Sequence, residues 1–170
     1  WLIQNMDTST AQWQILGQQV MMAPLKALNW PSTIYVNDDQ WDGYRYERNR
    51  LYDSIQARGI NNMVVLTGDI HTSWANDLPL SNYDPSTGAN SLGVEFVATS
   101  VTSEGSPVNI GKSVLQLTNR HMKYIDLTKR GYCILDVNKT RTQMDWFYVD
   151  KIDARSTQEN WGASWQTFSG

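Results

Sequence analysis

Asp69 and His71 are the residues of this chain whose types and spacing are best suited to chemistry. They lie in the stretch VVLTGDIHTSW, where an apolar run from Val64 to Thr67 leads into Gly68. Two residues separated by one position in an extended segment point their side chains to the same side. A carboxylate and an imidazole that project together form a partial site for a divalent or trivalent metal ion. The pattern therefore predicts a pair of metal ligands.

The same stretch also has a purely structural interpretation. An aspartate after a strand often forms a turn or caps a helix, and a nearby histidine often only completes local hydrogen bonding. The context favours a site, because ligands of open α/β sheets gather at the carboxyl ends of strands. Gly68 would let the backbone turn sharply there. Thr72, Ser73 and Trp74 could then hold the imidazole by hydrogen bonds.

The elements around this stretch predict an α/β fold. Helical spacing of apolar residues predicts a helix over 42–58, with Asp42 as its N-cap and Gly59 just past its C-terminus. The run at 62–67 predicts a strand that is covered on both faces. Strands after residue 92 lie close together in sequence, so we expect antiparallel pairing there. Further predicted elements are the end of a helix at 1–10, strands at 13–20, 92–100, 121–127, 131–137 and 142–149, and a short helix at 114–120.

Composition limits the classes of function. The chain has 170 residues, 41% of them hydrophobic and 18% charged, which suits one globular domain with a single core. A net charge of −3 without basic blocks argues against binding to a nucleic-acid backbone. The sequence has no apolar run long enough for a membrane span. The chain starts at Trp1 without an initiating methionine, so we expect a piece cut from a longer protein.

Five segments, in the order in which they occur, resemble those of the PhoD-like alkaline phosphatases, a branch of the metallophosphatase superfamily. VVLTGDIHTSWANDL resembles the signature of this branch, which carries Gly-Asp-x-His where related metallophosphatases have Gly-His-x-His. The other four segments are DTSTAQWQILGQQVMMAPL, QWDGYRYERNRL, GVEFVATSVTSEG and NRHMKYIDLTKRGYCILDV. Together they cover most of residues 1–149, and their common order makes the resemblance far more specific than one motif would.

The resemblance implies both a fold and an activity. The expected fold is α/β, a mixed-sheet metallophosphatase-type αββα sandwich of which residues 1–150 form the C-terminal half only. Residues 151–170 would follow as a polar, Trp-containing tail. The implied activity is metal-dependent hydrolysis of phosphate mono- or diesters, with iron and calcium as metals and Asp69 and His71 as metal ligands. Family resemblance also implies a periplasmic or extracellular location.

The chain departs from the family pattern in its upstream ligands, whose motifs are not found here. A two-metal cluster needs about six protein ligands, and Asp69 and His71 supply only two. We therefore expect the missing N-terminal half to come from a second chain or a cleaved segment, and the isolated chain to be inactive. The alternative is a non-catalytic α/β fragment or partner-binding module. Nucleic acid enters only as a possible diester substrate.

Other polar residues leave alternatives open. His121 is either a general acid or phosphate donor near the site, or a residue that fixes a loop through backbone hydrogen bonds, which is favoured. Asp38, Asp39 and Asp42 could reach a calcium ion, although helix capping explains Asp42 more simply. Glu95, inside a predicted strand, either faces the cleft or pairs with an arginine.

Overall fold

The computed structural model describes residues 1–28, 31–105 and 111–170, and its central element is a five-stranded mixed sheet. The strand order is β1-β4-β6-β5-β7, in which β4 is parallel to both β1 and β6, and β5 is antiparallel to β6 and β7. The strands are β1 (Gln14–Gly17), β4 (Met63–Thr67), β5 (Ser73–Pro79), β6 (Ser91–Val97) and β7 (Met122–Asp126). The mixed α/β fold class expected from the sequence is confirmed.

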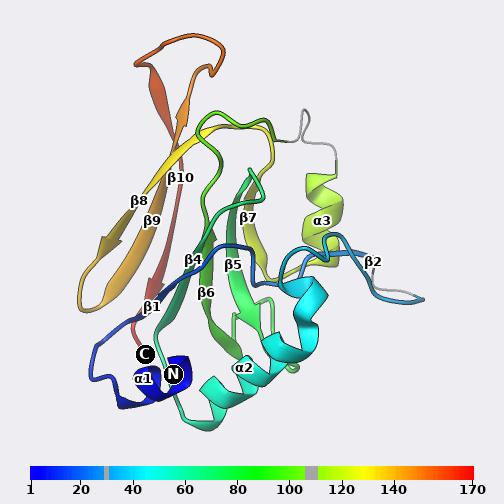
Figure 1. The fold of residues 1–170 in the computed structure, drawn as a ribbon, viewed down its shortest axis with the longest axis vertical. Coiled ribbons are helices and arrows are strands. Elements are labelled where there is room, and N and C mark those ends of the chain that lie inside the picture. Colours follow the sequence, from blue (N-terminus) through cyan, green and yellow to red (C-terminus); the bar gives the residue numbers. More distant parts are fainter. Residues whose placement is uncertain (29–30, 106–110) are drawn as a thin grey trace.

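Two smaller sheets and four helical segments complete the part of the chain that the structure describes (Figure 1). An antiparallel sheet has the order β10-β9-β8, and a short ribbon pairs β2 with β3. The strands of the antiparallel sheet are β8 (Gly131–Val137), β9 (Arg141–Val149) and β10 (Glu159–Phe168). The ribbon consists of β2 (Lys26–Leu28) and β3 (Ile34–Tyr35). The helical segments are α1 (Leu2–Thr8), η1 (Trp41–Tyr44), α2 (Arg45–Ala57) and α3 (Lys112–Thr118).

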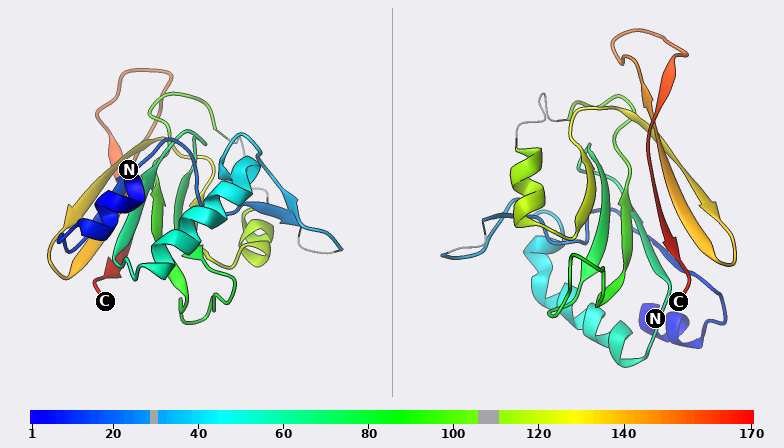
Figure 2. Two further views of the ribbon diagram at one scale, coloured as in Figure 1. Left: turned by 60° about the horizontal axis from the view of Figure 1, so that its bottom comes forward. Right: turned by 180° about the vertical axis from the view of Figure 1, so that it is seen from behind.

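The central sheet is covered differently on its two faces (Figure 2). Helices α1 and α2 lie on one face, while the three-stranded sheet packs on the other. Successive side chains of β4 point to opposite faces of the sheet. Val65 belongs to the core under the helices, and Val64 belongs to the core between the two sheets. Trp146 of β9 is fully buried in the second core, and its Nε1 donates to the Val97 carbonyl at 3.1 Å.

Strands β2, β3, β5 and β10 were missed in the sequence. Strand β5, SWANDLP, contains Asn, Asp and Pro, which are poor strand formers, yet five of its seven residues are buried between β6 and β7. Strand β10 lies in the segment expected to be a polar tail, where it pairs with β9 over nearly its whole length. Its apolar residues are few, so its sequence pattern is weak and the neighbouring strand determines its conformation.

A buried carboxylate holds the irregular segment 21–25 across the sheet. Glu95 of β6 is fully buried and accepts hydrogen bonds from the Met22 N–H at 2.6 Å and the Ala23 N–H at 3.1 Å. Asn76 Nδ2 donates a third at 3.0 Å. Burial raises the pKa of Glu95 above its usual range, and the backbone bond from Met22 opposes that shift. Neither expected role, facing a cleft or pairing with an arginine, describes this backbone-anchoring carboxylate.

A buried ion pair anchors the same segment to α2. Asp42 Oδ1 lies 2.7 Å from Arg48 Nη1, and Asp42 Oδ2 accepts the Leu25 N–H at 2.8 Å. Arg48 Nη1 also donates to the Met22 carbonyl at 3.2 Å. The prediction that Asp42 is a helix N-cap is wrong, because its oxygens are used by Arg48 and Leu25 and no side-chain cap is formed. Asp42 is also not available to a calcium ion.

His121 serves the structural role favoured in the sequence. Its Nε2 lies 2.9 Å from the Pro24 carbonyl, which can only accept, so Nε2 carries the proton. The side chain is 6% exposed. Burial lowers the pKa of His121 to about 4, and nearby Lys26, Arg48 and Lys123 add to this shift.

The neutral state of His121 predicts an acid-sensitive fold. The unfolded chain binds a proton to this histidine below about pH 6.5, whereas the folded chain does so only below about pH 4, so stability falls as the pH falls through this window. The loss amounts to about 3 kcal/mol at most. Urea unfolding of the intact protein between these pH values measures it. His121→Gln, which keeps a donor for Pro24, should show a flatter dependence, and an identical slope would contradict this assignment.

Candidate functional site

The Gly68–His71 loop lies where parallel strands end together. Strand β4 lies between β1 and β6, and the chain leaves it at Thr67. The Gly68 N–H donates to the Gln19 carbonyl at 3.3 Å, and the Ala98 N–H donates to the Thr67 carbonyl at 2.9 Å. Segments that follow β1 and β6 therefore flank the loop, which is the position expected for a ligand site in an α/β sheet.

The loop backbone is not extended, contrary to the sequence-based expectation. Asp69 and His71 have φ angles of 70° and 59°, in the left-handed region. That region costs an L-residue roughly 1 kcal/mol or more, although Asp and His enter it more readily than most residues. Two such residues in one short loop are a form of strain that is typical of functional sites.

The imidazole of His71 is held in one orientation by a backbone carbonyl. Its Nδ1 lies 2.8 Å from the carbonyl oxygen of Glu104, which can only accept a hydrogen bond. Nδ1 is therefore the donor of this hydrogen bond, and Nε2 is the ring nitrogen left for another partner on a partly exposed side chain. A histidine that ligates a metal usually has its other nitrogen bonded to a carbonyl or carboxylate in this way.

The segment that carries Glu104 is itself fixed by hydrogen bonds. The Thr99 hydroxyl lies 3.1 Å from the His71 carbonyl, and the Ser100 hydroxyl donates to the Ser103 carbonyl at 2.6 Å. Arg130 Nε donates to the same Ser103 carbonyl at 2.8 Å. The imidazole is thus positioned by residues 30 or so positions away, through backbone atoms.

Thr72, Ser73 and Trp74 do not hold the imidazole, so that expectation is wrong. Trp74 Nε1 instead donates to the Thr72 hydroxyl at 2.6 Å, and all three side chains are buried. Thr72 precedes β5, and Ser73 and Trp74 begin it, so all three side chains belong to the packed interior.

Gly105 packs closely against the backbone of the Gly68–His71 loop. A Cβ at this position would lie 2.6 Å from the His71 carbonyl oxygen and 3.1 Å from the Arg130 guanidinium carbon. Gly105→Ala should displace the loop and lower the free energy of unfolding by about 1–3 kcal/mol, because the His71 carbonyl must move away from the added methyl group. Urea unfolding measures this loss. Gly17→Ala, whose Cβ would meet nothing within 4 Å, is the matched control. Equal stability of both variants would contradict the prediction.

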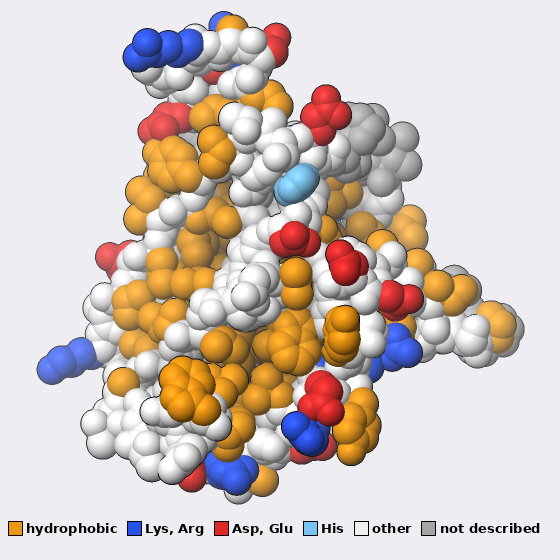
Figure 3. All heavy atoms as spheres, viewed as in Figure 1, with side chains coloured by type: hydrophobic (Ala, Val, Ile, Leu, Met, Phe, Trp, Pro, Cys, Tyr) orange, Lys and Arg blue, Asp and Glu red, His pale blue; other side chains and the backbone are white. Residues whose placement is uncertain are grey.

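Asp69 and His71 differ in exposure, and the structure brings no third metal-binding side chain of the described residues to them. Asp69 is exposed and His71 partly exposed. Figure 3 shows a histidine side chain at the surface with acidic side chains close to it. Among residues 1–28, 31–105 and 111–170, no group of three or more His, Cys, Asp or Glu side chains is arranged to hold a metal ion. Imidazole nitrogen and carboxylate oxygen are donor types that suit a metal ion.

The remaining acidic candidates do not join this pair. Asp38 and Asp39 are exposed, and Asp38 lies 3.9 Å from Arg45 Nη1 in a surface ion pair. Glu95 and Asp42 are buried under the segment 21–25, where their oxygens are already hydrogen-bonded.

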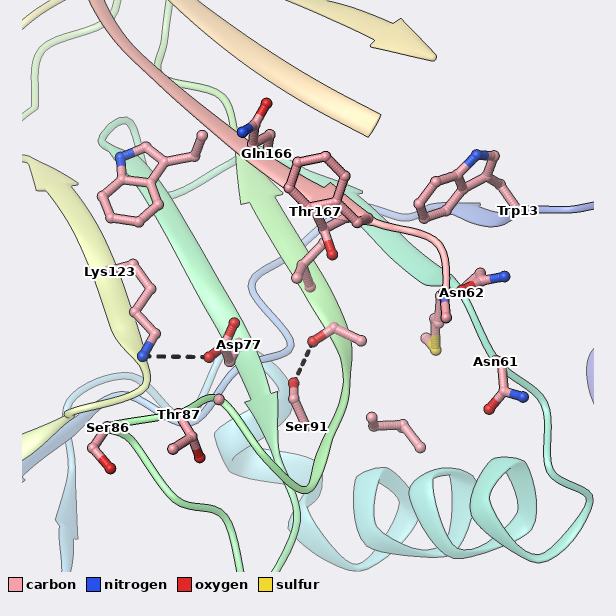
Figure 4. A pocket seen from close by; sticks show the side chains of 18 residues that line it. Trp13, Asn61, Asn62, Asp77, Ser86, Thr87, Ser91, Lys123, Gln166 and Thr167 are labelled. Atoms are coloured by element: carbon pink, nitrogen blue, oxygen red, sulfur yellow. Dashed lines mark hydrogen bonds and ion pairs between the residues drawn. The ribbon is translucent and has the colours of Figure 1, made fainter. Parts of the chain in front are cut away.

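A pocket of about 690 Å³ lies at the opposite end of the central sheet (Figure 4). Asn62, directly before β4, and Ser91, the first residue of β6, are among the residues that line it. Asp69, in contrast, follows the end of β4. Its charged residues, Lys123 and Asp77, neutralise each other at 3.4 Å. The pocket is therefore separate from the candidate metal ligands.

Comparison with known proteins agrees with this arrangement. The family model described as "PhoD-like phosphatase" matches residues 1–146. Alkaline phosphatase D of Bacillus subtilis (strain 168) is 36% identical over 148 residues, which are 86% of this chain and 25% of that protein. A solved structure titled "Structure of PhoD" superposes with a TM-score of 0.90 at 32% identity, covering 99% of this chain and 32% of the other. The chain thus spans about a quarter to a third of these relatives, and it belongs to the PhoD-like phosphatase family.

Proposed function

We propose that the protein hydrolyses phosphate mono- or diesters with bound metal ions, and that Asp69 and His71 are two of the metal ligands. The observation that carries this proposal is the orientation of His71, whose Nδ1 is bonded to the Glu104 carbonyl at 2.8 Å while Nε2 remains free. Membership in the PhoD-like phosphatase family supports the reaction type.

Iron and calcium are the metals we propose, because the donor types suit them. Imidazole nitrogen and carboxylate oxygen are suitable iron ligands, and carboxylates also suit calcium. When bound, such ions polarise phosphoryl oxygens, neutralise developing charge and lower the pKa of bound water. The chain's own part is to hold Asp69 and His71 at a strand end, with the His71 tautomer fixed by Glu104.

We propose that the other ligands come from protein outside residues 1–170, as a second chain or a separate segment of the same protein. Residues 1–150 would then form one half of the catalytic domain. The support is that this chain covers 25% of its curated relative and that its described residues contain no group of three or more metal-binding side chains.

We further propose a periplasmic or extracellular location, which rests on the family alone. No helix in the described ranges is both long and apolar enough to cross a membrane. Cell fractionation with an activity assay tests the location.

Metal removal tests the function. Dialysis of the intact protein against a chelator should abolish hydrolysis of p-nitrophenyl phosphate and bis-p-nitrophenyl phosphate, and the fold should persist by circular dichroism. Adding back iron and calcium should restore the activity, and elemental analysis should find both. Full hydrolysis by metal-free protein would refute the proposal.

A further inference from the structure

A small pocket lies between the beginning of α2 and the segment that follows β1. Its volume is about 210 Å³, enough for a ring-sized organic group. The residues that line it are Val20, Asp39, Gln40, Trp41, Tyr44 and Glu47.

Hydrogen bonds connect the wall of this pocket to the loop of the candidate metal ligands. The Gly68 N–H donates to the carbonyl of Gln19, the residue before Val20, at 3.3 Å. Trp41 Nε1 donates to Gln18 Oε1 at 3.1 Å. The segment 18–20 is therefore shared between the pocket and the loop. Figure 3 shows apolar side chains below the histidine and the acidic groups on one face of the molecule.

The lining favours an organic group over a phosphate. Val20, Trp41 and Tyr44 supply apolar and aromatic surface, and no lysine or arginine lines the pocket in the part of the chain that is described. Aromatic side chains bind rings through large buried contact areas. Asp39 adds a negative charge at the rim, whereas the charge of Glu47 is paired with Arg50 at 3.0 Å. A second anionic group on the ligand would be repelled here.

We propose that this pocket binds the organic part of the substrate and makes the enzyme favour phosphate esters of uncharged aromatic or apolar alcohols. The inference rests on the proposed function, since it places the ester's phosphate at the Gly68–His71 loop and its alcohol against Tyr44. Tyr44 is a suitable probe because its side chain is 64% exposed in residues 1–170, so that its removal leaves the core of this part of the protein intact.

The test compares two substrates in the intact protein. Tyr44→Ala should lower kcat/KM for 2-naphthyl phosphate by about five- to tenfold and change that for glycerol phosphate less than about twofold. Val20→Phe, which fills the pocket, should show the same selective loss. For each substrate, kcat/KM of the variant is divided by that of the unmodified protein, so differences in leaving-group reactivity between the two substrates cancel. The matched control is Tyr46→Ala, two residues further on in α2, 76% exposed and outside the pocket, which should affect neither substrate.

Each outcome separates the two proposals. If the unmodified, metal-loaded protein hydrolyses neither ester, the proposed function fails. If it hydrolyses both, and Tyr44→Ala and Val20→Phe lower both equally or neither, the function stands and the pocket assignment is overturned. A selective loss that Tyr46→Ala reproduces would also overturn it.

Discussion

Replacing His71 by alanine or asparagine in the intact protein should lower kcat/KM for p-nitrophenyl phosphate by more than about a hundredfold. Loss of an outer-sphere partner of a metal ligand typically costs about ten- to a hundredfold, and removal of the ligand itself costs more. Asparagine accepts the left-handed backbone of this position, where φ is 59°, so this variant separates loss of the imidazole from backbone strain. Steady-state kinetics and metal content are the measurements.

The second histidine of the chain is the control for that experiment. His121 is buried against the Pro24 carbonyl, away from the loop, so His121→Gln should retain most of the activity near neutral pH. Full activity of both His71 variants, with the metals still bound, would remove His71 from the proposed site.

Replacing Glu95 by alanine should have the largest effect on stability, with a loss of about 3–5 kcal/mol. The substitution leaves the Met22 and Ala23 N–H groups and the Asn76 amide without their acceptor in the buried core. Glu95→Gln should be intermediate, because one amide oxygen can replace only one carboxylate oxygen. Denaturant unfolding monitored by tryptophan fluorescence measures both variants.

Glu159 is the matched control for the buried carboxylate. It lies on the exposed strand β10 and accepts a hydrogen bond from the Tyr132 hydroxyl at 2.9 Å. Glu159→Ala should change stability by less than about 0.5–1 kcal/mol. If Glu95→Ala were equally mild, the carboxylate would not be what holds segment 21–25.

The elements found from the sequence are those with strong local signals. Strand β4 is a nearly continuous apolar run, and α2 has helical spacing with Gly59 after it, at a φ of 64°. Strands β5 and β10 are determined by their neighbours, since β5 contains polar residues that become buried only between β6 and β7. Local propensity could not predict them.

The candidate site was predictable only in part, for a similar reason. Residue types reveal Asp69 and His71, but the group that orients His71 is the backbone carbonyl of Glu104, which leaves no trace in residue identity. The left-handed backbone at Asp69 and His71 was missed because, among residue types, only glycine indicates that conformation reliably in a sequence. Glu95 was expected either to face the cleft or to pair with an arginine, and its backbone partners, more than 70 residues away, were not predicted.

The most direct test of the account is to locate the metal ions in crystals of the intact, active protein by anomalous scattering. The account predicts a peak about 2 Å from His71 Nε2, with an Asp69 carboxylate oxygen in the same cluster and His71 Nδ1 still bonded to the Glu104 carbonyl. Metal peaks found only at other residues, with both side chains unliganded, would contradict it.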